Sequence, residues 1–125
     1  MVAPAMTYSA AANILASGSL AASGTTTADV DLSAKFEGQF QFKNTGGGSV
    51  AGTNGLKIEW FKRAGTTPDI DTEPMGSLVI PTTVSTTKYA SVHLPTGKWR
   101  FRLTNLDASN AITVQITGDT VDSVS

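Results

Sequence analysis

The chain has no cysteine, one histidine and no long apolar run. Without cysteine it can form neither disulfides nor thiolate metal sites, and it has no cysteine nucleophile. No stretch approaches the roughly 20 apolar residues that span a bilayer. The opening MVAPAMTYSAAANILASGS lacks the basic and apolar regions of a secretion signal. The formal net charge is −1, so the chain has no net positive field that would attract nucleic acid or an anionic membrane. We therefore expect neither a membrane nor a nucleic acid as a partner.

The residues that the chain has in abundance are threonine, serine, alanine and glycine. Threonine favours the half-buried surface of a sheet, whereas glycine and serine favour turns. A length of 125 residues corresponds to one domain, with enough chain for one modest core. The composition therefore predicts a single all-β domain.

About eight short stretches show the pattern of strands, with alternating polar and apolar residues between turn signals. They are residues 13–20, 25–32, 36–43, 55–63, 77–80, 88–94, 98–103 and 112–117. Residues 1–12 show neither alternation nor helix caps, so we predict an extended N-terminal arm. Residues 13–125 are predicted to form a single-domain β-sandwich or jelly-roll-like barrel of antiparallel strands.

The segment KWRFR, residues 98–102, alternates cations with large aromatic residues. A platform for single-stranded nucleic acid needs exposed aromatic rings beside its positive charges. Here Trp99 and Phe101 share the parity of Leu103, so the pleat of a strand directs them into the core and away from the cations. The cations form a row on the outer face, where a neighbouring acidic surface would offset their mutual repulsion. This cationic row consists of Lys98, Arg100 and Arg102.

The same parity argument assigns inner faces to two other strands. In residues 36–43 the inward set is Phe36, Gly38, Phe40 and Phe42. In residues 55–63 the inward set is Leu56, Ile58 and Trp60. Phe61 has the opposite parity and is predicted to point outward.

Three carboxylates alternate along the loop segment PDIDTEP, namely Asp69, Asp71 and Glu73. Calcium takes about six to eight oxygen ligands, but the segment has neither the spacing nor the glycine of a recognised calcium loop. The other predicted use of these carboxylates is as the acidic partner of the cationic row on a second subunit.

No group of residues predicts catalysis or a cofactor. Asp29 and Asp31 share the outer parity of a strand, and His93 is predicted to be exposed, with no GxSxG elbow to supply a serine nucleophile. The glycine-rich segment 44–55 lacks the lysine and hydroxyl residue of a phosphate-binding loop. We therefore predict no catalytic, metal-binding or cofactor-binding residue and expect that the protein is not an enzyme.

Two segments resemble small structural proteins of tailed bacteriophages, most of all head decoration, or cement, proteins. They are ILASGSLAASGTTTADVDLSAKFEGQFQFKNTGG, residues 14–47, and GKWRFRLTNLDASNAITVQITGDTVDSV, residues 97–124. The similarity lies in composition and strand pattern. It implies a virion protein, assembled in the host cytoplasm and often trimeric, that stabilises a capsid by binding across its subunits. The partner would be the major capsid protein or another virion protein.

The partner-binding residues predicted on this basis lie in the arm, the cationic row and the acidic loop. They are Tyr8, Lys98, Arg100, Arg102, Asp69, Asp71 and Glu73. Two alternatives stay open. One is a phage tail, baseplate or fibre accessory, which differs only in its partner. The other is a carbohydrate-binding β-sandwich module, whose exposed aromatic residues would come from outside the inward parity: Tyr8, Phe61 and Tyr89.

Overall fold

The computed structural model describes the backbone of residues 6–48, 55–62 and 74–124, and the side chains of residues 12–48, 55–62 and 74–121. Eight strands and no helix occur in this part of the chain. The strands are β1 (Met6–Leu20), β2 (Thr25–Asp31), β3 (Glu37–Gly46), β4 (Gly55–Lys62), β5 (Gly76–Pro81), β6 (Thr87–Pro95), β7 (Lys98–Asn105) and β8 (Ile112–Val124). The all-β class is thereby confirmed. In the described part of the chain, nothing resembles a helix that could cross a membrane.

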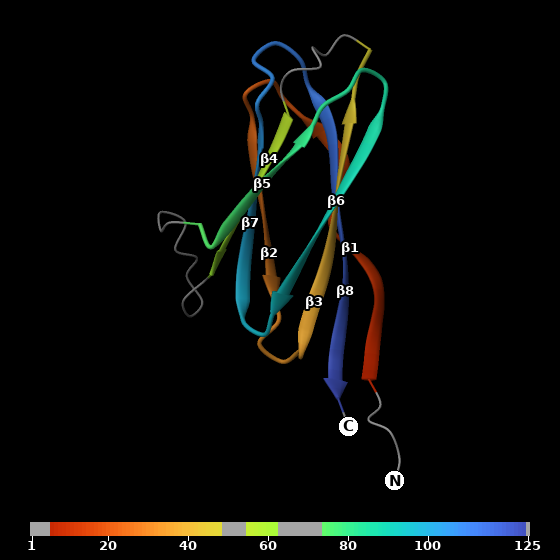
Figure 1. Ribbon diagram of the computed structural model, residues 1–125, viewed down its shortest axis with the longest axis vertical. Coiled ribbons are helices and arrows are strands. Elements are labelled where there is room, and N and C mark those ends of the chain that lie inside the picture. The colour runs from red at the N-terminus through yellow and green to blue at the C-terminus, as the bar shows by residue number, and fades with distance from the viewer. Residues whose placement is uncertain (1–5, 49–54, 63–73, 125) are drawn as a thin grey trace.

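The strands form two four-stranded antiparallel sheets that pack face to face (Figure 1). Sheet I has the order β1-β8-β3-β6, and sheet II has the order β2-β7-β4-β5. The first strand pairs with the last, the second with the seventh, the third with the sixth and the fourth with the fifth. This is the strand order of an eight-stranded jelly roll. The predicted β-sandwich is therefore confirmed, with β3 and β8 central in sheet I.

The core lies between the two sheets and contains the aromatic residues of the KWRFR segment. Trp99 and Phe101 are 4% and 0% exposed, which confirms the predicted parity of this strand. Phe101 of sheet II contacts two rings of sheet I edge-on, with centroids 5.1 Å from Phe40 and 5.0 Å from Phe42. Such pairs add about 0.5–1.5 kcal/mol each beyond the burial of their area.

Two glycines make room for the Phe40 ring within sheet I. Gly118 lies directly opposite Phe40 in the register of β3 and β8, and Gly38 lies two residues before it on β3. A Cβ atom on either glycine would lie 2.8 Å from carbons of the Phe40 ring. The ring therefore fills the space that a side chain would take at both positions.

β1 begins at Met6, within the segment predicted as an extended N-terminal arm, residues 1–12. The backbone of residues 6–12 pairs with β8, where Met6 lies opposite Val124 and Ala12 lies opposite Gly118. The strand continues because β8 runs to Val124, beyond the predicted end at 117, and supplies backbone partners that need no alternation of side chains.

Two aromatic residues have the opposite exposure to the one predicted. Phe36 is 55% exposed, because β3 begins one residue after it and the parity of the strand does not reach it. Phe61 is only 2% exposed although it follows the outward parity of β4. The guanidinium of Arg102 covers its ring, 4.7 Å from the centroid. Trp60, predicted to point inward, is half-buried and packs against the core.

Candidate functional site

The outer face of sheet I is polar across its three neighbouring strands β8, β3 and β6. Because the strands are antiparallel and in register, outward side chains form rows across the sheet. Gln41 lies between Ser91 and Thr117 in one row, and Gln39 lies between His93 and Asp119 in the next. Residues far apart in the sequence therefore meet on one surface.

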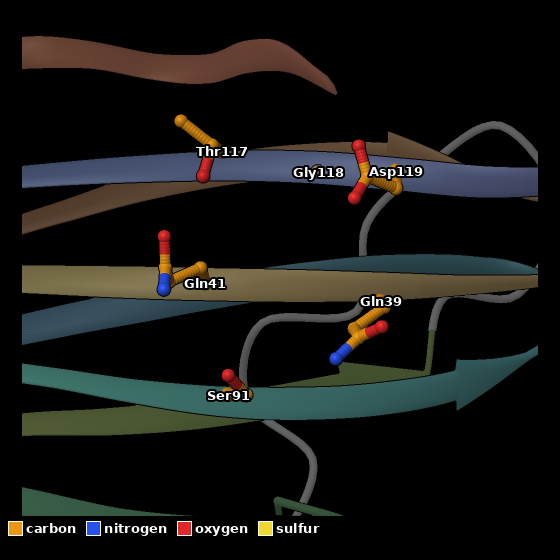
Figure 2. Close-up of a pocket in the computed structure, with 6 residues that line it drawn as sticks. All are labelled: Gln39, Gln41, Ser91, Thr117, Gly118 and Asp119. Carbon is orange, nitrogen blue, oxygen red and sulfur yellow. The ribbon is translucent and has the colours of Figure 1, made fainter. Parts of the chain in front are cut away.

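This face is hollowed at its centre. A shallow pocket of about 190 Å³, which we call the hollow, is lined by Gln39, Gln41, Ser91, Thr117, Gly118 and Asp119. Figure 2 shows the two glutamines on β3, flanked by Ser91 on β6 and by Thr117 and Asp119 on β8. Gly118 adds only backbone to the lining, since any side chain here would point toward Phe40.

The side chains that line the hollow have no partners within the described chain. Neither a hydrogen bond nor an ion pair joins any of these five side chains to another described group. They present two amides, two hydroxyls and one carboxylate. Amides and hydroxyls both donate and accept hydrogen bonds, whereas a carboxylate only accepts. The hollow is therefore equipped to bind a ligand that carries donors and acceptors in close alternation.

An exposed aromatic ring lies beside the hollow. Tyr89 is 59% exposed and lies two residues before Ser91 on β6, on the same face and about 7 Å away along the strand. The exposure predicted for Tyr89 is confirmed. On the opposite side of the sheet face, Gln115 Nε2 donates to Asn13 Oδ1 over 2.7 Å, which fixes that amide pair.

His93 lies at the end of the face and is exposed, as predicted. Its Nε2 atom is 3.5 Å from Oε1 of Glu37, and 60% of its side chain is exposed. Within the described residues no group of three or more histidine, aspartate or glutamate side chains could hold a metal ion. The imidazole therefore has one carboxylate neighbour and does not form part of a metal cluster there.

The cationic row lies on the other side of the molecule, on the outer face of sheet II. Arg100 makes two hydrogen bonds to Asp29, from Nε over 2.6 Å and from Nη2 over 2.9 Å. The hydrogen bond to this carboxylate raises the pKa of Arg100 above its ordinary value. Arg102 makes a 3.0 Å hydrogen bond to Glu59, which is only 6% exposed.

For both arginines, a carboxylate partner is thus present within the chain, on the neighbouring strands β2 and β4. Lys98 lies opposite Asp31 in the same register. A role of the row in binding a partner stays a prediction.

None of the remaining predicted site residues has a described contact with the hollow. Asp69, Asp71 and Glu73 lie outside the described residues. Tyr8 lies on β1 opposite Val121, in the part of that strand whose side chains are not described. Phe61 is buried and offers no ring for stacking.

The sequence reasoning missed the hollow itself. The alternation of β3 places Gln39 and Gln41 outward, but it does not show which residues of other strands flank them. A signal was available in their chemistry, because two neutral amides occupy neighbouring outward positions of a central strand. No local pattern indicates Asp119, because this residue lies beyond the predicted end of β8.

No family model matches this chain, and no curated protein matches it. Among solved structures, the K3 cleaved adhesin domain of Lys-gingipain from Porphyromonas gingivalis W83 is similar, with a TM-score of 0.51 and 13% identity. The match covers 77% of this chain and 63% of that domain, so the chain spans less than two thirds of it. A family 35 carbohydrate binding module from an environmental isolate has a TM-score of 0.50 and 15% identity, with 84% of this chain and 71% of that one covered. These likenesses show the β-sandwich fold and nothing finer.

Proposed function

We propose that the protein is a non-enzymatic β-sandwich module that binds carbohydrate in the hollow of sheet I. One observation carries the proposal: five polar side chains without partners in the described chain converge on one pocket beside an exposed tyrosine. A sugar presents hydroxyl groups, each of which donates and accepts a hydrogen bond. The amides of Gln39 and Gln41 and the hydroxyls of the lining match that pattern.

Tyr89 supplies the apolar part of such a site. Ligand sites combine aromatic surface with a few placed polar groups, which orient the ligand. The ring of Tyr89 can lie against the C–H face of a sugar while its hydroxyl stays in water. The exposed ring and the adjacent amides thus offer both kinds of contact on one face.

The comparison with solved structures supports the proposal by analogy. One structure of similar fold is a family 35 carbohydrate binding module. Jelly rolls occur in lectin domains as well as in viral capsids, so the strand order is compatible with both roles. Because a fold hosts many functions, the weight of the proposal rests on the hollow.

The virion role implied by the phage resemblance stays a prediction, as do its trimeric state and its capsid partner. The unpartnered polar face favours carbohydrate binding over that role, since capsid binding requires no such hollow.

A glycan microarray with the purified protein tests the proposal. We expect binding to at least one class of oligosaccharide, and a loss of about tenfold or more in affinity for Tyr89→Ala, because stacking on the ring is lost. Phe36→Ala is a matched control, since Phe36 is also an exposed aromatic residue, at 55%, and does not line the hollow. An array without signal for the folded protein would overturn the proposal, and so would equal losses for the two variants.

A further inference from the structure

The hollow carries a single charge, the carboxylate of Asp119. The other side chains that line it are neutral amides and hydroxyls. Asp119 makes no ion pair or hydrogen bond with any described side chain. Its charge is therefore available to whatever enters the hollow.

The other charged groups of this face lie outside the hollow. Lys43 is two rows away from Asp119, about 13 Å along the strands, where it lies opposite Tyr89 and Gln115. His93 shares the row of Asp119 but lies beyond Gln39 and beside Glu37. In the described chain, therefore, no lysine or arginine lines the hollow to neutralise its carboxylate.

We infer that the hollow selects uncharged sugars and rejects acidic ones, an inference that rests on the proposed function. The two oxygens of Asp119 accept hydrogen bonds from neighbouring hydroxyl groups of an uncharged sugar, and such bonds to a charged acceptor are stronger than neutral ones. A sugar carboxylate in the same hollow meets this charge at close range, where repulsion is only partly reduced by water. Asp119 is thus the specificity-determining residue.

The outer face of sheet II shows what a neutralised carboxylate looks like in this protein. There Asp29 receives two hydrogen bonds from Arg100. An acidic sugar would need an equivalent arginine or lysine in the hollow, and this lining contains neither. Asp29 has an arginine partner and Asp119 has none in the lining of the hollow, and on this difference we assign an uncharged ligand to the hollow.

Matched pairs of polysaccharides test the inference: glucan and glucuronan, mannan and mannuronan, galactan and galacturonan. Each pair is taken with the same glycosidic linkage, so that its two members differ in a carboxyl group in place of the hydroxymethyl group at C5, that is, in the oxidation of C6. We expect the protein to bind the uncharged member of at least one pair, and to bind its carboxylated counterpart about tenfold or more weakly in calorimetric titrations at low salt. Added salt should lower the ratio of the affinity for the uncharged member to that for the carboxylated member, because it screens the charge of Asp119.

Asp119→Asn should bring the ratio of the two affinities, uncharged over carboxylated, close to one. This holds whatever the substitution does to the affinity for the uncharged member. Glu37→Gln is the matched control, because it removes the same charge from the same sheet face outside the hollow. It should leave the ratio unchanged. Equal binding of both members by the unaltered protein, or an unchanged ratio in Asp119→Asn, overturns the inference but leaves carbohydrate binding intact. Failure to bind any of the six polymers, together with an empty glycan array, instead overturns the proposed function.

Discussion

On the outer face of sheet II, Arg100 and Arg102 form hydrogen bonds with Asp29 and Glu59 of neighbouring strands. On the outer face of sheet I, the side chains of the hollow make no such bonds within the described chain. Both faces belong to the same sandwich and cover the same core. The paired groups of sheet II contribute to stability, whereas the side chains of the hollow leave their hydrogen-bonding capacity unused within the described chain.

The charged face of sheet II is the weaker candidate for binding for the same reason. A partner that approached Arg100 or Arg102 would have to compete with carboxylates that already hold them. The side chains of the hollow exchange only water for a ligand. Substitutions on the two faces should therefore separate stability from binding.

The largest expected effect on stability comes from the position where the hollow meets the core. Gly118→Val should lower the free energy of unfolding by about 2–3 kcal/mol, because its side chain would overlap the Phe40 ring and strain the packing. Urea unfolding followed by tryptophan fluorescence measures this change. Binding of glycans should also weaken, since β3 and β8 must shift apart. Unaltered stability would show that the ring moves aside without cost and would contradict the packing argument.

The second effect isolates the charge pairs of sheet II. Glu59→Ala should lower the free energy of unfolding by about 2 kcal/mol, because it leaves Arg102 without its buried acceptor. Arg102 is partly exposed, which keeps the cost below that of a fully buried pair.

Glycan affinity measured on the Glu59→Ala protein should stay unchanged at a temperature where it remains folded. If Glu59→Ala kept full stability but lost glycan binding, sheet II would contribute to binding and not to stability, which contradicts the contrast between the two faces.

Much of this architecture follows from the alternation of residues along the chain. Each predicted strand overlaps an observed one, although β1 and β8 are longer than predicted, and the parity of KWRFR correctly separates its aromatic residues from its cations. Alternation is a local property, which is why it fails where tertiary contacts decide. Phe61 is buried by Arg102 of another strand, and Phe36 lies outside the strand whose parity it was given.

The turn NLDASN shows the same limit. Its sequence predicts a turn, but the structure makes Asn105 a buried anchor, with Nδ2 donating to the carbonyl oxygens of Leu20, Ala21 and Asn110. These bonds tie the loop before β8 to the end of β1, a segment 85 residues away from Asn105 in the sequence. The hollow depends on the same kind of information, because it exists only in the register of β3 with β6 and β8. β3 is joined to neither β6 nor β8 by a hairpin, so no turn in the sequence fixes that register.

The smallest expected effect on stability lies at the centre of the hollow. Gln41→Ala should change the free energy of unfolding by less than about 0.5 kcal/mol, because this exposed side chain makes no bond with the described chain that could be lost. It should nevertheless lower glycan affinity by about tenfold, since one buried hydrogen bond to a ligand is worth roughly that much. Thr27→Ala on the exposed edge of sheet II is the control and should alter neither quantity. Calorimetric titration and urea unfolding of the same two variants give both values. If Gln41→Ala lost stability and kept its affinity, the amide would serve the fold, and the contrast between the two faces would disappear.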